Sequence, residues 1–165
     1  MPTWETSAVE TPDLDRLDRR ILDVLQREGR ISMTELAQRV GLSASPCTER
    51  VKRMERAGVI TGYHARLAPE ALGRELVVFV EITLSTKSDE VFDAIRDELQ
   101  NMPEVLECHL VSGGFDYLVK FRLRGMAEYR HQLGEVLKRL PVPAASQSYV
   151  VMEVIKDGME LPLDR

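Results

Sequence analysis

Cysteine is scarce in this chain of 165 residues, and its scarcity excludes several classes of protein. The two cysteines, Cys47 and Cys108, lie far apart and lack the C-x-x-C spacing of metal and redox motifs. Two such residues cannot form a disulfide framework, and alone they cannot complete a four-ligand zinc site. We therefore expect free thiols in a reducing compartment.

Long apolar runs are also missing. A membrane helix needs about 18 or more consecutive apolar residues, and the densest apolar segment, residues 76–84, is interrupted by Glu81. The first 15 residues are acidic and contain neither the basic nor the apolar region of a secretory signal. The sequence therefore predicts a cytoplasmic protein with no membrane partner.

An overall excess of basic charge is absent as well. The chain has 22 Lys and Arg against 27 Asp and Glu, for a net charge of −5, which argues against a uniformly basic coat for nucleic acid. The charge is unevenly divided, because residues 13–66 hold 11 basic and 8 acidic side chains, net +3, which leaves −8 for the rest. Positive charge is thus concentrated in one part of the chain.

That basic part has the pattern of three short helices. Apolar residues recur at three- and four-residue steps over residues 13–25. Ser32 and Glu35 have the spacing of a capping box at the start of a second helix, which Gly41 ends. A third helix follows, and β-branched and aromatic residues over 59–67 then predict a short hairpin or strand. This order matches a winged helix-turn-helix.

The third helix carries the candidate contacts to double-stranded DNA. Cys47, Val51 and Met54, spaced i, i+4, i+7, predict its buried face, and the opposite face is cationic. Lys and Arg neutralise phosphates, and Arg also bridges guanine edges in the major groove. The candidate DNA-binding residues are Ser43, Ser45, Pro46, Thr48, Glu49, Arg50, Lys52, Arg53 and Arg56.

After a linker, the pattern changes to β-α-β-β-α-β. Strands are predicted at residues 76–84, 105–111, 115–123 and 148–155, and helices at 89–101 and 126–140. This order forms a four-stranded antiparallel sheet with both helices on one face, the ferredoxin-like arrangement. Apolar residues on both sides of the last predicted strand suggest that a second copy covers the other face. The fold class is therefore α+β.

An enzyme is a rival interpretation, since ferredoxin-like domains also host catalysis. However, His64, His109 and His131 lie on three different predicted elements. Cys108 and His109 are consecutive strand residues and face opposite sides of a sheet, so they cannot ligate one metal together. We predict no catalytic residue, no metal and no cofactor. The alternative, an effector sensor or enzyme without DNA contact, would leave the cationic helix face unexplained.

Many segments resemble the Lrp/AsnC family of bacterial and archaeal transcription factors. The matching segments are residues 14–19, 21–22, 28–32, 39–43, 46–47, 49–51, 78–84, 107–113, 115–118 and 149–153. The resemblance implies a nucleoid-associated regulator of amino-acid metabolism genes. It further implies homodimers that assemble into tetramers, octamers or larger forms, and a C-terminal RAM domain that binds a small amino acid, leucine or a similar one.

The resemblance also implies an effector site between RAM domains. The matching effector-binding residues are Leu110, Ser112, Gly113, Gly114, Asp116, Met126, Tyr149, Val150 and Val151. Their chemistry fits an amino acid, because the amides of Gly113 and Gly114 can form a small nest for a carboxylate and Asp116 can pair with an ammonium group. Read from the residues alone, an ordinary glycine hairpin remains the alternative.

The expected domain organisation has five parts. They are a flexible tail at residues 1–12, the winged helix-turn-helix at 13–67, a linker at 68–74, the effector-binding and oligomerisation domain at 75–157, and a C-terminal tail at 158–165.

Overall fold

The computed structural model describes residues 13–163, so the tail expected at residues 1–12 lies outside the described part. The described chain divides into two compact units. The first consists of residues 13–66 together with 157–163, and the second consists of residues 67–156. Each unit has its own apolar core.

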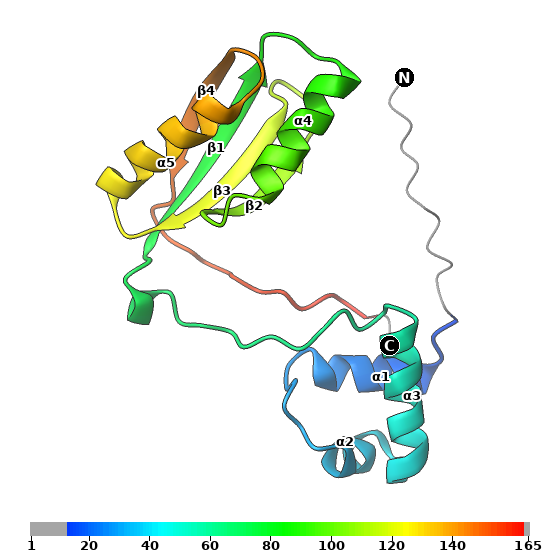
Figure 1. Cartoon of the computed structure of the whole chain (residues 1–165). Coiled ribbons are helices and arrows are strands. Elements are labelled where there is room, and N and C mark those ends of the chain that lie inside the picture. Colours follow the sequence, from blue (N-terminus) through cyan, green and yellow to red (C-terminus); the bar gives the residue numbers. More distant parts are fainter. Residues whose placement is uncertain (1–12, 164–165) are drawn as a thin grey trace. The chain divides into compact units, whose positions relative to one another are not determined.

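The first unit is a bundle of three helices, α1 (Arg16–Leu25), α2 (Met33–Val40) and α3 (Ala44–Arg56) (Figure 1). Gly41 ends α2 with φ 76°, a left-handed conformation that glycine adopts without a Cβ clash, and thereby makes the tight turn into α3. The core of the unit is formed by Ile21, Leu25, Leu36, Ala37, Val40, Cys47, Val51 and Met54.

The helix starts differ in one respect from the sequence expectation. A reciprocal capping box is present at α1, where the side chains of Asp15 and Asp18 each accept the other's backbone N–H. At α2 only half of the predicted box forms. The Ser32 hydroxyl accepts the Glu35 N–H at 3.2 Å, but the Glu35 carboxylate binds Arg39 at 2.7 Å instead of returning to the cap.

The predicted strand or hairpin at residues 59–67 is wrong. This segment has no strand in the structure, because a strand needs a neighbouring main chain for its ladder and the described residues of this unit offer none. Tyr63 holds the segment instead, donating its hydroxyl to the Glu55 carboxylate at 3.0 Å. The β-branched residues of this segment therefore do not mark a strand, because no other strand pairs with it.

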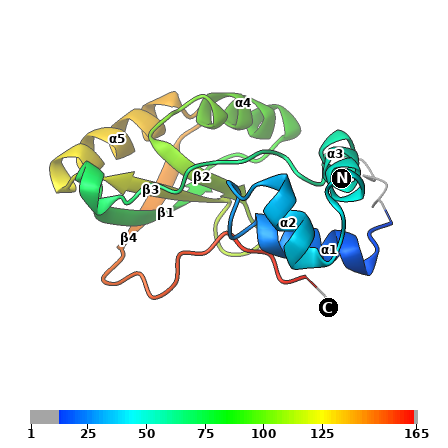
Figure 2. The ribbon, with the colours of Figure 1, turned by 90° about the horizontal axis from the view of Figure 1, so that it is seen from below.

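The second unit confirms the predicted ferredoxin-like arrangement. A short 3-10 turn, η1 (Glu70–Leu72), precedes four antiparallel strands in the order β2-β3-β1-β4. Helices α4 and α5 cover one face of the sheet (Figure 2). The elements are β1 (Leu76–Leu84), α4 (Asp89–Gln100), β2 (Val105–Leu110), β3 (Tyr117–Leu123), α5 (Met126–Arg139) and β4 (Ala144–Val150).

The core of this unit lies between the sheet and the two helices. Alternate residues of β1 and β3 are buried, as expected when one face of each strand meets a hydrophobic layer. Phe121, at 0% exposure, sits at the centre and meets Tyr129 of α5 edge to face, with ring centroids 6.5 Å apart. Ile95 of α4 and Val136 of α5 close the layer from the helix side.

The predicted range of the last strand, 148–155, is wrong at both ends. Strand β4 begins at Ala144, because β1 extends to Leu84 and pairs with it there. It ends near Val151, whose N–H still donates to the Val77 carbonyl at 2.9 Å. The chain then leaves the edge of β1, and Met152 and Ile155 are more than 90% exposed.

The sheet face turned away from the helices is more polar than the last-strand pattern suggested. In the register, Tyr149 is opposite Phe79 and Gln147 is opposite Glu81. Lys120 lies 5.9 Å from the centroid of the Phe79 ring and forms an ion pair with Glu107 at 2.7 Å. This face is therefore a mixture of aromatic and charged side chains rather than an apolar surface.

Because the two cores are separate, we expect a core truncation to destabilise one unit only. Leu36 is fully buried in the first unit, and Leu36→Ala should cost that unit about 2–5 kcal/mol. Urea denaturation with peptide-resolved hydrogen exchange measures each unit. Thr34→Ala, at an exposed position of the same helix, should change stability by less than about 0.5 kcal/mol. An equal loss in both units would contradict separate cores.

Candidate functional site

Helix α3 has a buried face and an exposed cationic face. The buried residues are the three that the spacing predicts, Cys47, Val51 and Met54, and they join the core of the first unit. The opposite face includes Lys52 and Arg56, both exposed. An α-helix of this kind, the second of a helix-turn-helix pair, is the element that enters a DNA major groove.

The first turn of α3 is open to solvent. Ser43 is the N-cap residue, but its side chain makes no capping hydrogen bond, and Ser45 and Pro46 are exposed. Thr48, in contrast, donates its hydroxyl to the Ala44 carbonyl at 2.8 Å. The amides of a first turn have no helical partners and attract phosphate oxygens. The turn thus offers amides and two serine hydroxyls to a phosphate, whereas the Thr48 hydroxyl is used inside the helix.

Two arginines of α3 are bound to a buried carboxylate of α1. Asp18 is 0% exposed, and its two oxygens accept Arg50 at 2.9 Å and Arg53 at 2.5 Å. Arg50 also binds Asp15 at 2.6 Å. The hydrogen bonds that Asp15 accepts from the Asp18 backbone and from Arg50 lower its pKa. A buried carboxylate is costly unless it is paired and hydrogen-bonded, so these contacts fix α3 against α1.

This cluster divides the candidate DNA contacts into two kinds. Arg50 and Arg53 are engaged within the protein, which their spacing along the helix did not indicate. Lys52 has only a distant partner, Glu49 at 3.9 Å, and Arg56 has no ion-pair partner among residues 13–163. One signal in the sequence does mark the cluster: an aspartate, Asp18, on the otherwise apolar face of α1.

In the second unit, Asp116 is the one charged candidate of the expected effector site, and it is buried. It is the last residue of the loop between β2 and β3 and is 6% exposed. One carboxylate oxygen accepts the Leu84 N–H at 2.8 Å, and the other binds the Lys87 ammonium at 2.7 Å. The residue expected to bind an ammonium group thus holds one from its own chain.

The loop that ends with Asp116 spans residues 111–116 and is longer than the two-glycine turn that the sequence suggests. The Val111 N–H donates to the Asp116 carbonyl at 2.9 Å and closes the loop. Gly113 has φ 149°, a conformation that disfavours other residues. Within the described chain, the amides of 112–115 donate to no backbone carbonyl, so they are available to an anion.

Eight of the nine effector candidates form two separate groups within one chain. Leu110 pairs with Tyr117, which is opposite Ile82, whereas Val150 pairs with Val78. These rows are four residues apart along β1, about 13 Å, and β2 and β4 are opposite edges of the sheet. The hairpin group comprises Leu110, Ser112, Gly113, Gly114 and Asp116, and the β4 group comprises Tyr149, Val150 and Val151. Met126 is the first residue of α5.

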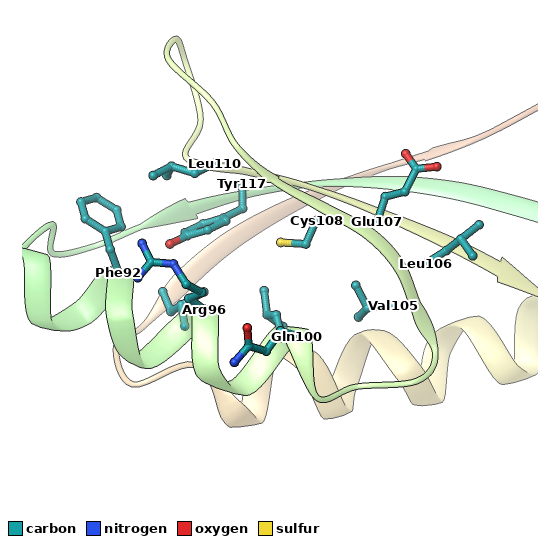
Figure 3. Close-up of a pocket in the computed structure, with 11 residues that line it drawn as sticks. Phe92, Arg96, Gln100, Val105, Leu106, Glu107, Cys108, Leu110 and Tyr117 are labelled. Atoms are coloured by element: carbon teal, nitrogen blue, oxygen red, sulfur yellow. The ribbon is translucent and has the colours of Figure 1, made fainter. Parts of the chain in front are cut away.

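A cavity of about 380 Å³ lies between α4 and β2, next to the hairpin group (Figure 3). Leu110 is the only effector candidate that lines it, beside Phe92 and Tyr117. Among the described lining residues Arg96 is the one cation, and it also binds Asp93 at 2.5 Å. The sequence did not mark this cavity, because its lining residues come from a helix and a strand that the pattern alone does not place side by side.

The remaining candidates for chemistry offer no reactive centre. Cys108 points its sulfur into the cavity (Figure 3), but burial raises its pKa to about 11, so the thiol is uncharged at neutral pH and a poor nucleophile. Among residues 13–163, no three His, Cys, Asp or Glu side chains are grouped to hold a metal ion. Within the same range, no helix has the length and apolarity required to span a membrane.

Comparisons with known proteins agree with both units. Residues 14–61 match a family model described as "Winged helix-turn-helix DNA-binding", and residues 77–161 match one described as "Lrp/AsnC ligand binding domain". The leucine-responsive regulatory proteins of Klebsiella pneumoniae and Escherichia coli K12 are each 53% identical over 149 residues, which cover 90% of this chain and 91% of theirs.

Two solved structures are similar over nearly the whole chain. An AsnC family transcriptional regulator from Agrobacterium tumefaciens has a TM-score of 0.86 at 35% identity and covers 90% of this chain and 97% of its own. A transcriptional regulator from Neisseria meningitidis, solved in complex with L-Met, has a TM-score of 0.86 at 34% identity, with 92% and 98% covered.

A helix-turn-helix with an exposed cationic helix, joined to a ligand-binding sheet domain, defines a DNA-binding transcription regulator and not an enzyme. Within that class, the chain belongs to the Lrp/AsnC family. The helix-turn-helix DNA-binding unit that the sequence pattern predicted and the ligand-binding domain that the resemblance implied are thus confirmed at the level of the family.

The shared carboxylate predicts strongly non-additive effects on stability. Arg50→Ala or Arg53→Ala alone leaves Asp18 with one guanidinium and should cost about 1 kcal/mol. The double variant leaves the buried charge without a guanidinium and should cost about 3–5 kcal/mol, more than the sum. Urea unfolding of the first unit measures the free energy of unfolding of the wild type, the two single variants and the double variant. Lys52→Ala, at an exposed position of the same helix, is the control. Additive losses would show that the two arginines do not share Asp18.

Proposed function

We propose that this regulator controls genes of amino-acid metabolism by placing α3 in the major groove. The observation that carries the proposal is the arrangement of α3, whose cations Lys52 and Arg56 lie exposed on a helix fixed by the buried Asp18. The proposed DNA-binding residues are Ser43, Ser45, Pro46, Thr48, Glu49, Arg50, Lys52, Arg53 and Arg56. Their unit corresponds to residues 13–67.

These residues divide into three roles. Arg56 and Lys52 neutralise phosphates or bridge guanine edges, and Glu49 accepts from cytosine. Ser43 and Ser45, with the first-turn amides, bind the backbone. Arg50 and Arg53 act mainly by holding the angle of α3, and Arg53, which is half exposed, also adds positive charge to the interface.

We also propose that the chain acts as a homodimer that assembles further, to tetramers, octamers or larger forms. Two recognition helices then meet half-sites about one turn of DNA apart, roughly 34 Å. In this assignment residues 75–157 bind effector and assemble, and residues 68–74 are the linker. A DNA-bound regulator of this kind works in the cytoplasm and associates with the nucleoid.

The effector that we propose is a small amino acid, leucine or a related apolar one. Support comes from the names of the two leucine-responsive relatives and from the L-Met complex of the Neisseria protein. In this chain, the free amides of the 112–115 loop suit an α-carboxylate, and Asp116 suits an α-ammonium that takes the place of Lys87. The adjoining apolar cavity suits an aliphatic side chain.

Completion of this site requires more than one chain. The hairpin group and the β4 group lie at opposite edges of one sheet, so a single ligand cannot touch both within one copy. We infer that the β4 group of another copy meets the hairpin group. Ligand binding then favours one assembly of the protein over another. The ligand alters regulation through this coupling between effector binding and assembly, and not by direct contact with DNA.

Removal of Arg56 should weaken DNA binding and reduce its dependence on salt. The slope of log affinity against log salt falls by about 1 for each phosphate that the protein no longer neutralises. We expect this for Arg56→Ala, and a smaller direct effect for Arg53→Ala. Gel shifts over a salt series on a duplex selected from a random library measure both. Arg96→Ala, on α4 of the other unit, is the control. An unchanged slope for Arg56→Ala would show that Arg56 does not neutralise a phosphate in the complex.

Calorimetry with a panel of amino acids should detect binding by leucine or a close relative. Asp116→Asn keeps an acceptor for the Leu84 N–H but loses the charge, so we expect affinity to fall about tenfold or more. N-acetyl-leucine, which lacks the ammonium group, should bind the wild type and this variant about equally. The control is Asp93→Asn, an exposed carboxylate paired with Arg96. If no amino acid gives heat or changes assembly size, the effector assignment fails.

A further inference from the structure

The chain returns to the DNA-binding unit after leaving the sheet domain. Residues 157–163, which we name the strap, cluster with the three helices. Gln26, at the C-terminal end of α1, makes two hydrogen bonds with Leu161: its amide donates to the Leu161 carbonyl at 3.1 Å and its carbonyl accepts the Leu161 N–H at 3.0 Å. The Gln26 side-chain amide thus pairs with the Leu161 backbone through one donated and one accepted hydrogen bond, as the backbone of a neighbouring strand would.

Two further contacts fix the position of the strap. Arg27 binds Glu160 at 3.1 Å, while its other nitrogens bind Asp23 one helical turn earlier. Arg66, at the end of the helical unit, donates to the Asp157 carbonyl. Three side chains from two parts of the unit therefore hold one extended segment through its backbone and one carboxylate.

The strap is held by polar contacts rather than by burial. Met159 is 89% exposed and Leu161 71% exposed, so little apolar surface leaves the water when the segment docks. Exposed hydrogen bonds and ion pairs contribute little each, and salt weakens the ion pair. An attachment of this kind opens and closes readily in solution.

The strap also has a direct covalent link to the proposed effector residues. Strand β4 ends beside Val151, whose N–H donates to the Val77 carbonyl, and only residues 152–156 separate it from the strap. The DNA-binding unit is therefore joined to the sheet domain twice along the chain, once through the linker and once through the strap.

We propose that the surface formed by Gln26, Arg27 and Arg66 is a docking site for the chain's own residues 157–163. This detachable connection transmits changes at β4 to the DNA-binding unit. The transmission part rests on the proposed effector function, whereas the docking part does not. Releasing the strap leaves α3 and its DNA contacts intact but weakens the response to effector.

Hydrogen exchange on the full-length protein tests the docking. In wild type the Leu161 amide, which donates to Gln26, should be protected. Gln26→Ala should speed its exchange about three- to tenfold, with smaller increases at neighbouring strap residues. Gln38→Ala, an exposed glutamine on α2, is the matched control and should change nothing there. Unprotected exchange of Leu161 in wild type, or an unchanged rate in Gln26→Ala, overturns the docking.

DNA titrations with and without the amino acid identified by calorimetry test the transmission. A chain ending at Lys156, and Gln26→Ala, should bind DNA within about twofold of wild type without effector, yet lose at least half of the effector-induced change. A full response in both variants overturns the transmission. A wild type that responds to no amino acid instead overturns the proposed effector, and the exchange measurement still decides the docking.

Discussion

The DNA-binding unit depends on one buried carboxylate. Asp18 has no exposed surface, and its two oxygens are held by Arg50 and Arg53 of the recognition helix. A charge in that position is tolerated only while it is paired. The same two ion pairs therefore stabilise the bundle and hold α3 in its orientation against α1. Lys52 and Arg56, which we propose as DNA contacts, lie on neighbouring positions of the same helix and make no contact with Asp18.

Much of the architecture could be read from the sequence because its signals are local. The burial of Cys47, Val51 and Met54 follows from a 3.6-residue period, and the sheet order follows from the β-α-β-β-α-β sequence of elements. The errors arise where the pairing of strands determines whether a segment is a strand and where it begins. The start of β4 at Ala144 depends on β1 extending to Leu84, and residues 59–67 lack a neighbouring strand. Neither fact can be read from the segment itself.

The candidate site was only partly predictable, for the same reason. The sequence placed Arg50 and Arg53 around the outward side of α3 but did not show their engagement with Asp18, which lies more than 30 residues earlier in the chain. It suggested Asp116 as a partner for an ammonium group but did not show that Lys87 already occupies it. The division of the effector candidates between opposite sheet edges needs the strand register. Side-chain partners that are distant in sequence are set by tertiary packing, which local periodicity does not encode.

The two separate cores have a consequence for how such regulators diversify. Because the cores share no residue, we expect substitutions that reshape the sheet domain for a new ligand to leave the packing of the helical bundle intact. Changes at Lys52 or Arg56, the proposed DNA contacts, should likewise leave the sheet intact. Sensor and reader can therefore drift at different rates within one gene. Few positions affect both units. They lie in the linker and in residues 152–163, where the chain passes from one unit to the other.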